Sequence, residues 1–290
     1  MNMKIAISAE TTIDLPKPML EEFDISLIPF TVIMGEEEFA DGEVTPAELF
    51  AYTEKTGKLP RTAAINQYQY GEHFRSLLKK YDVVIHFCLS SEMSTACSNA
   101  IAASHEDDLE GKVYVVDSRV LSTGIALEAI YARRLANIGK SPEEIVELVK
   151  ERIPYSNTSF SLESVNYLYK GGRCSMLAMM GANLLRLKPA IYVNDGKMGA
   201  GKKYRGPMLK AVMDYVEDTL ALYPNPDHDL VFITYSSAPD NVVKAVEERL
   251  KKAGFRDIRK TTAGGTISCH CGPHCLGILY FNDGDHPLGD

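Results

Sequence analysis

The segment Asp82-Val-Val-Ile-His-Phe-Cys-Leu89, followed at once by the serine- and alanine-rich residues 90–104, gives the clearest indication of fold in this 290-residue chain. The first part is an almost continuous apolar run, which is typical of a strand buried on both faces of a parallel sheet. The second part is expected to be a helix. The same pattern recurs with a strand at 112–116 and a helix at 120–137. Strands that alternate with helices predict an α/β fold whose parallel sheet is flanked by helices.

The residues on either side of this core extend the same pattern. We expect strands at 4–8 and 25–34 and an amphipathic helix at 70–80. Thr45-Pro46-Ala47-Glu48 and Ser141-Pro142-Glu143-Glu144 each combine a capping hydroxyl, a proline at the first helical position and a glutamate that can cap back. Each therefore predicts the start of a helix.

The second half of the chain changes character. Asn194-Asp195-Gly196 lies between two strand-like segments and predicts a hairpin. Further strands are expected at 158–162, 230–235, 256–261 and 277–281, and helices at 208–222 and 240–252. We therefore expect a C-terminal α/β lobe (157–290) with a mixed, partly antiparallel sheet. It would follow an N-terminal α/β lobe (1–156), with the boundary near residues 154–157 and a substantial interface between the two lobes.

Composition excludes several classes of protein. Hydrophobic residues make up 45% and charged residues 24%, as in ordinary globular proteins rather than disordered or fibrous ones. No window reaches the 18 apolar residues of a transmembrane helix, so stable membrane insertion is not expected. The net charge of −8 argues against a nucleic-acid or anionic-membrane partner. Without a signal peptide, the six cysteines are expected to be reduced thiols in a cytoplasmic protein.

Two hydroxyl-bearing segments are candidates for ligand binding. Ser90-Ser91-Glu92-Met93-Ser94-Thr95 lies where a buried strand ends and a helix begins, which is where α/β proteins bind anions. Ser94 could hold a carboxylate there, or these serines could simply cap the helix. Thr62, in Leu59-Pro60-Arg61-Thr62, could hold a polar ligand group or could be an ordinary turn hydroxyl.

The cysteine- and histidine-rich segment Thr266-Ile-Ser-Cys-His-Cys-Gly-Pro-His-Cys275 suggests a metal site at first sight. Its spacing disagrees, because the second Cys-x-x-Cys pair of a structural zinc site is missing. We expect no metal here. Cys269 and Cys271 are expected to alternate along one face of a strand, and the glycine-proline loop is expected to place His270 in a cleft.

The glycine- and lysine-rich residues 196–203 nearly match a phosphate-binding P-loop, but Lys203 occupies the position of the required Ser or Thr. A flexible hairpin is the better interpretation. Lys202, Lys203, Arg205 and Lys210 form a local group of positive charges, which is either a solvated face or a docking surface for an acidic partner.

Motifs of nucleophilic, dinucleotide-dependent and zinc-dependent enzymes are missing. The chain has no Gly-x-Ser-x-Gly, no Gly-x-Gly-x-x-Gly and no His-Glu-x-x-His. Ser94 and His270 could in principle act as nucleophile and base, but the sequence identifies no carboxylate to orient the histidine.

Seven short motifs in order resemble the DegV family of bacterial fatty-acid-binding proteins, from about Lys4 to Phe281. They are Ser8-Ala-Glu-Thr-Thr-Ile-Asp-Leu-Pro16, Leu59-Pro-Arg-Thr62, Leu89-Ser-Ser-Glu-Met-Ser94, Val115-Val-Asp-Ser118, Tyr169-Lys-Gly-Gly-Arg173, Leu187-Lys-Pro189 and His270-Cys-Gly-Pro273. The resemblance implies a single two-lobed module that holds one long-chain fatty acid in an apolar tunnel. It implies a binding protein rather than an enzyme, with no cofactor besides the bound acid.

The resemblance also assigns roles to individual residues. Thr62 and Ser94 would hold the carboxylate, with Arg173 and His270 in the polar network behind it. The protein would present the carboxyl group to a separate fatty acid kinase, which makes an acyl phosphate for phospholipid synthesis. Arg205, with Lys202 and Lys203, would dock that kinase.

The chain departs from the usual motifs of the family in three places. It has Thr62-Ala-Ala-Ile-Asn66 for Thr-Ser-Gln-Pro-Ser, Met93-Ser-Thr-Ala96 for Leu-Ser-Gly-Thr, and His274 in place of a glycine. These differences bear on chain-length preference and head-group geometry. Two other classes remain as alternatives: an esterase or acyl-transfer enzyme that uses Ser94 and His270, and a redox or metal-sensing module at Cys269, Cys271 and Cys275.

Overall fold

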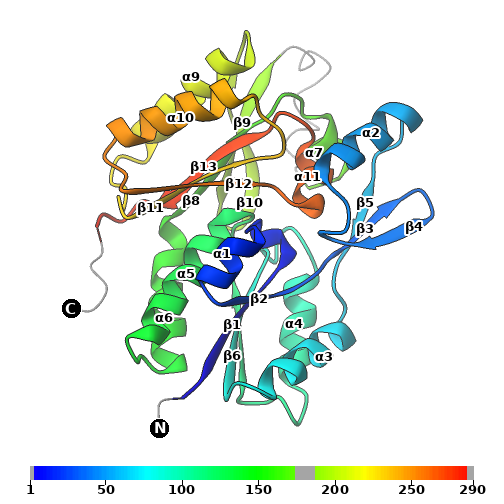
Figure 1. Cartoon of the computed structure of the whole chain (residues 1–290), viewed down its shortest axis with the longest axis vertical. Helices are drawn as coiled ribbons and strands as arrows, with labels where there is room; N and C mark the ends of the chain where they lie inside the picture. The colour runs from blue at the N-terminus through cyan, green and yellow to red at the C-terminus, as the bar shows by residue number, and fades with distance from the viewer. Residues whose placement is uncertain (1–2, 174–186, 286–290) are drawn as a thin grey trace.

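The computed structural model describes residues 3–173 and 187–285, and Cys174 lies outside them. Within these residues the strands form three sheets (Figure 1). A four-stranded sheet has the order β2-β1-β6-β7, a six-stranded sheet the order β10-β9-β8-β13-β11-β12, and a small sheet the order β4-β3-β5. No helix in the described ranges is both long enough and apolar enough to cross a membrane.

The four-stranded sheet confirms the predicted parallel α/β architecture. Its neighbouring strands are all parallel, and every residue of β6 is buried, as the apolar run at 82–89 indicates. Helices α3 and α4 lie on one side of the sheet, and α5 and α6 on the other (Figure 1). The elements are β1 (Ile5–Glu10), α1 (Lys17–Glu22), β2 (Ile25–Ile28), α3 (Gln67–Leu78), β6 (Val83–Cys88), α4 (Ala96–Ser104), β7 (Val113–Asp117), α5 (Thr123–Asn137) and α6 (Pro142–Arg152).

The six-stranded sheet confirms the predicted mixed sheet. Only β11 and β12 pair in parallel, and the other neighbours are antiparallel. Helices α9 and α10 cover one face, whereas α5 packs against the other. The elements are β8 (Ser156–Ser161), β9 (Lys188–Asn194), β10 (Lys197–Tyr204), α9 (Met208–Leu222), β11 (Leu230–Tyr235), α10 (Asp240–Lys252), β12 (Asp257–Thr262) and β13 (Leu276–Phe281).

The small sheet was not predicted, and one expected strand is wrong. Residues 25–34 form two strands in different sheets, β2 and β3 (Thr31–Met34), because the chain breaks beside Pro29, which has no N–H to donate. Strand β3 pairs with β4 (Glu37–Ala40) and β5 (Arg61–Ala63). Helices α2 (Pro46–Thr56) and α7 (Asn166–Lys170) and the 3-10 turns at Thr11–Ile13 and Ile153–Tyr155 complete the chain. The capping boxes predicted at Thr45 and Ser141 are both present.

The segment around His270 is also not the expected strand and loop. It forms the short helix α11 (Gly265–Cys271), so Cys269 and Cys271 do not alternate on a strand face. The Asp41 carboxylate accepts hydrogen bonds from the Gly265 and Thr266 amides at 2.8 and 3.1 Å. A remote carboxylate therefore satisfies the free amides at the start of this helix.

The two large sheets meet across a shared interface. One apolar cluster includes Ile125 and Leu127 of α5 together with Phe160 and Leu279 of the six-stranded sheet. The hairpin turn between β9 and β10 also reaches the N-terminal elements. There the Ser90 hydroxyl donates to the Gly196 carbonyl at 2.7 Å. The interface thus combines apolar packing with hydrogen bonds at its edge.

Gly196 gives a test of this edge contact. Its φ of +80° is strained for other residues, and a Cβ there would lie 2.6 Å from Arg119 Cζ and 2.8 Å from Ser90 Oγ. Gly111 has a similar φ of +73°, but no described atom lies within 4 Å of a Cβ added there. We expect Gly111→Ala to lower the free energy of unfolding by about 1–2 kcal/mol. Gly196→Ala should cost at least about 1 kcal/mol more, because of the added clash. Urea unfolding measures both, and equal losses would contradict the proposed contact.

Candidate functional site

A cavity of about 490 Å³ lies between the four-stranded and six-stranded sheets. Its volume is within the range of about 300–1,000 Å³ typical of small-molecule sites. Much of its wall is apolar and comes from both halves of the chain. Large contributors are Phe30, Leu89, Met93, Phe160, Met198 and Leu279.

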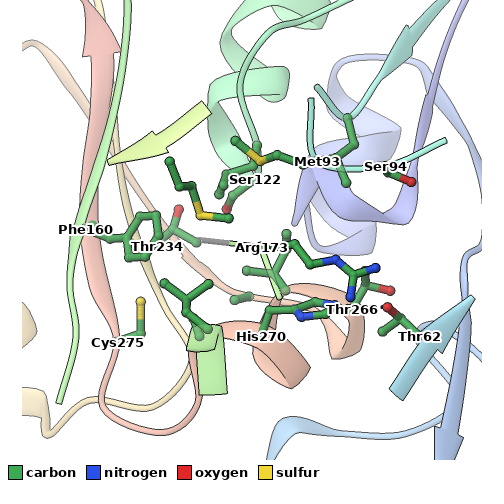
Figure 2. A pocket seen from close by; sticks show the side chains of 18 of the residues that line it. Thr62, Met93, Ser94, Ser122, Phe160, Arg173, Thr234, Thr266, His270 and Cys275 are labelled. Carbon is green, nitrogen blue, oxygen red and sulfur yellow. Dashed lines mark hydrogen bonds between the residues drawn. The ribbon is translucent and has the colours of Figure 1, made fainter. Parts of the chain in front are cut away.

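Four residues singled out in the sequence, from four separate elements, line this cavity together. Thr62 belongs to β5, Ser94 precedes α4, Arg173 follows α7, and His270 lies on α11. The Thr62 hydroxyl and His270 Nε2 are hydrogen-bonded at 3.0 Å. Figure 2 shows Ser94 on the wall across from this pair, with the Arg173 side chain between the two walls. We call this the polar end of the cavity, and Phe160, Thr234 and Cys275 mark the opposite end (Figure 2).

Ser94 is placed for both of the roles that the sequence left open, supporting the start of a helix and facing a ligand. Its hydroxyl oxygen accepts a hydrogen bond from the Ala96 amide at 3.1 Å, which supports the start of α4. The helix begins at Ala96 rather than at Ser90, and its N-cap residue, Thr95, makes no side-chain capping bond. Ser94 also lines the cavity, so its hydroxyl proton remains available to a bound group.

His270 is held as a neutral ring. Burial, with the nearby positive charge of Arg173, lowers the pKa of His270 to about 4. Its Nε2 is bonded to Thr62, and its Nδ1 is buried without a hydrogen-bond partner among the described residues. The hydrogen bonds of the described residues therefore form no Ser94–His270 pair and supply no carboxylate to orient the ring. These are the two features that nucleophilic catalysis needs.

Thr266 is a cavity residue that the sequence did not single out. It lies one turn before His270 on α11, so both side chains share a face of the helix. Its side chain is 3% exposed, lines the cavity, and carries a hydroxyl without a partner among the described residues. The spacing of four residues would have identified it, had 265–271 been predicted as a helix. Thr266 adds a third hydroxyl to the polar end.

Three other hydroxyl groups of the cavity wall already have protein partners. Thr234 bonds to Thr123 at 2.6 Å and to Thr261 at 2.9 Å, and Ser159 bonds to the Tyr215 hydroxyl at 2.9 Å. Ser236 donates to the Gly272 carbonyl at 2.5 Å. Because these polar atoms are satisfied by the protein, this part of the wall does not require a polar ligand.

Two of the four cations in the expected surface cluster are paired with aspartates. Lys202 pairs with Asp218 at 2.8 Å and Lys210 pairs with Asp214 at 2.5 Å, so acidic neighbours offset two of the charges. Lys203 and Arg205 are exposed. Residues 197–203 of the near match to a P-loop lie in strand β10, so no helix opens directly after Lys202.

Cys269, Cys271 and Cys275 form no group of metal ligands with the residues that the structure describes. Cys269 packs in a small cluster with Val32 and Leu49, whereas Cys271 and Cys275 belong to the main core. Across residues 3–173 and 187–285, one group brings three possible ligand atoms together: Glu10, His86 and Cys88. All three are buried, and both Glu10 oxygens already accept hydrogen bonds from the protein.

Comparisons with known proteins agree with this architecture. The family model of the DegV family matches residues 4–283. A Thermotoga maritima protein named "Fatty acid-binding protein" is 27% identical, with 95% of this chain and 97% of that protein covered. The crystal structure of DegV from Bacillus subtilis, titled a fatty acid binding protein, is 26% identical and has a TM-score of 0.83, covering 96% and 99% of the two chains.

A third comparison shows the fold alone, because the sequence identity is only 20%. It is the Streptococcus pneumoniae Fatty Acid Kinase (Fak) B3 protein loaded with linoleic acid, with a TM-score of 0.83 and coverage of 97% and 100%. The match to the family model covers residues 4–283, which include both of the large sheets that enclose the cavity. This chain therefore belongs to the DegV family.

Proposed function

We propose that this protein binds one long-chain fatty acid in the cavity between its two sheets. The carboxylate would lie at the polar end and the hydrocarbon chain would extend toward Phe160 and Cys275. One observation carries the proposal: an apolar cavity reaches from the core to a group of uncharged hydroxyls at Thr62, Ser94 and Thr266. The names of the DegV relatives, two of which are called fatty-acid-binding, support it.

The energetics of such a complex are favourable. A sixteen-carbon acid buries about 15 methylene or methyl groups at about 0.8 kcal/mol each, or roughly 12 kcal/mol in total. Loss of translational, rotational and chain freedom offsets a large part of this gain. The remainder is enough for a micromolar to nanomolar complex. Apolar burial therefore supplies the affinity, and the polar end supplies the orientation.

The polar end can bind a carboxylate without pairing it to a buried cation. If His270 carries its proton on Nε2, it donates to the Thr62 oxygen, and the Thr62 proton is then free for the carboxylate. Ser94 and Thr266 can donate in the same way. Arg173 is exposed and hydrogen-bonds to the Gly171 carbonyl at 2.6 Å. A carboxylate bound by hydroxyls keeps more of its nucleophilic character than one in a direct ion pair.

That reactivity supports a carrier role. We infer that the loaded protein presents the carboxylate to a fatty acid kinase. It would act in the cytoplasm, with the acid bound between an N-terminal lobe at 1–156 and a C-terminal lobe at 157–290. Lys203 and Arg205, the exposed cations of β10 and the turn after it, would dock the kinase with Lys202 beside them. The protein itself would catalyse no reaction.

The head-group contacts can be tested by substitution. We expect Thr62→Val and Ser94→Ala each to weaken fatty-acid binding about tenfold, because each removes a hydrogen bond to a charged group. Ser76→Ala, at an exposed serine on α3, is the control and should bind normally. Fluorescent fatty-acid displacement measures the affinities, and mass spectrometry of solvent extracts measures the acid carried by purified protein.

Two results would contradict the binding proposal. One is purified protein that neither contains nor takes up fatty acid at a ratio near one to one. The other is hydrolysis of a chromogenic acyl ester that disappears in Ser94→Ala, which would favour the esterase alternative.

Kinase docking gives a separate prediction. We expect Lys203→Glu and Arg205→Glu each to raise the KM of a bacterial fatty acid kinase for the loaded protein several-fold. The reason is that rim charges steer association. Lys244→Glu, on the exposed side of α10, is the matched control. Fatty-acid affinity should be unchanged in all three variants. A KM equal to that of the unaltered protein in both β10-side variants would show that docking occurs elsewhere.

The neutral state of His270 predicts how stability depends on pH. The unfolded chain binds a proton at His270 with a pKa near 6.5, whereas the folded chain does so only near pH 4. Acid therefore favours unfolding, and this contribution is lost as the pH falls from about 6.5 to about 4. We expect wild type to lose on the order of 3 kcal/mol more than His270→Gln over this range. Urea unfolding of both proteins at pH 7 and pH 4 measures the difference, and parallel pH profiles would contradict a buried neutral histidine.

A further inference from the structure

A cluster of buried polar side chains lies on one face of the four-stranded sheet. Ser8 of β1 stands beside His86 of β6 in the strand register. Because alternate residues of a strand point to the same face, Glu10 and Cys88 follow them on that face. All four residues are fully buried. None of the four lines the cavity between the sheets, so this cluster is separate from the site described above.

The cluster brings together the atoms that bind transition metals. One carboxylate oxygen of Glu10, one ring nitrogen of His86 and the Cys88 sulfur all lie within 4.8 Å of one another. The buried Cys97 thiol, on α4, is hydrogen-bonded to Cys88 and can supply a fourth ligand. Zinc takes four such ligands in a tetrahedron, with ligand atoms about 3.4–3.8 Å apart. The widest gap in the cluster therefore has to close by about 1 Å around an ion.

His86 has the hydrogen bonds of a metal-binding histidine. Its Nδ1 bonds to the Ser8 hydroxyl at 3.0 Å, and that hydroxyl bonds in turn to His73 Nε2 at 2.8 Å. Its Nε2 is buried and has no hydrogen-bond partner among the described residues. A histidine that ligates a metal usually donates its other ring N–H in this way, which fixes the ring and leaves a lone pair for the ion. A metal ion would satisfy the ring nitrogen that the described residues leave unpaired.

Glu10 is held in place by donors and still has room for a cation. The Tyr70 hydroxyl donates to its Oε1 at 2.5 Å, whereas the Thr12 hydroxyl and the Leu89 amide donate to its Oε2 at 3.1 and 2.8 Å. Each carboxylate oxygen has two lone pairs, so Oε1 can bind a cation and keep its bond to Tyr70. Carboxylates that ligate metals are commonly held by hydrogen bonds of this kind.

We propose that one Zn²⁺ ion binds between the four-stranded sheet and helices α3 and α4 (Figure 1), held by Glu10, His86, Cys88 and Cys97. Binding releases the protons that keep these buried groups neutral. Two thiolates and one carboxylate then surround the ion with a neutral imidazole, which leaves a single negative charge, as in a Cys₃His zinc site. The hydrogen bonds donated to Glu10 partly offset that charge.

The ion would fix the segment that carries a head-group residue of the cavity. Leu89 directly follows Cys88, its amide bonds to Glu10, and its side chain lines the cavity. Ser94 lies on the same connection, and Cys97 follows it at the start of α4. The ion would therefore hold the segment 89–96 at both ends. The inference goes beyond the proposed function and does not depend on it.

The unaltered chain provides the first test. The protein is unfolded in urea with a chelator and a thiol reductant, freed of the chelator, and refolded with Zn²⁺ or with Co²⁺ as a spectroscopic probe. We expect one zinc ion per chain by elemental analysis. Co²⁺ should give the intense visible bands of a tetrahedral centre and a near-ultraviolet charge-transfer band from thiolate. This result needs no substitution in the core, so a misfolded variant cannot obscure it.

Substitutions then locate the ion. Cys88→Ser and His86→Gln each remove a ligand and should weaken zinc binding at least about a hundredfold, measured by competition with a chelator of known affinity. Ser8→Ala removes only the hydroxyl that holds the His86 ring and should weaken it about tenfold. Cys269→Ser, at a buried cysteine in a different apolar cluster, is the matched control and should bind zinc normally. Zinc should raise the Tm of wild type and control, but not of Cys88→Ser.

Two results would overturn the zinc site. One is wild-type protein that retains far less than one zinc ion per chain and gives only the weak Co²⁺ bands of octahedral coordination. The other is zinc affinity in Cys88→Ser and His86→Gln equal to that of Cys269→Ser. Selective loss in those two variants supports the site. Fluorescent fatty-acid displacement on the metal-free protein measures the proposed function separately, so the two proposals can fail independently.

Discussion

The hydrogen bond between Thr62 and His270 is the contact on which the arrangement of the site depends. It joins two residues 208 positions apart, one on a three-residue strand of the small sheet and one on a seven-residue helix. Neither element is long enough to be stable alone. The bond sets the orientation of the imidazole ring and of the threonine hydroxyl together. Both residues line the cavity, so the proposed carboxylate would lie beside this hydrogen bond.

Two buried aspartates hold helix α11 in place. Asp41 binds the first amides of the helix, and Asp14 accepts a hydrogen bond from the Gly264 amide at 2.7 Å and from the Ser122 hydroxyl at 2.5 Å. Burial raises the pKa of Asp14 to about 8. These contacts connect α11 to the loop after β1 and to the start of α5. The positions of Thr266 and His270 therefore depend on residues from both halves of the chain, which explains why the polar end lies where the two large sheets meet.

Secondary structure is predicted best where the pattern lies within a single helix, strand or turn. Helices α9 and α10 and strand β11 lie where apolar periodicity placed them, and Asp195-Gly196 forms the expected hairpin turn. The small sheet escaped prediction because its strands have only three or four residues, and because β5 is remote in sequence from β3, with which it pairs. Helix α11 escaped because its sequence, Gly-Thr-Ile-Ser-Cys-His-Cys, has little helix propensity and depends on Asp41. Periodicity alone could not bring Thr62 and His270 together. Their shared site followed from the family resemblance, whereas the role of Thr266 required the structure.

We propose that the acid binds in a single orientation, with its carboxylate among the hydroxyls and its tail toward the opposite end of the cavity. A crystal structure with 16-bromohexadecanoic acid tests this most directly, because anomalous scattering locates the bromine at the end of the tail. We expect bromine beside Phe160 and Cys275, and carboxylate oxygens within about 3 Å of the Thr62 and Ser94 hydroxyls. Bromine beside Thr62, or an acid bound outside the cavity, would contradict it.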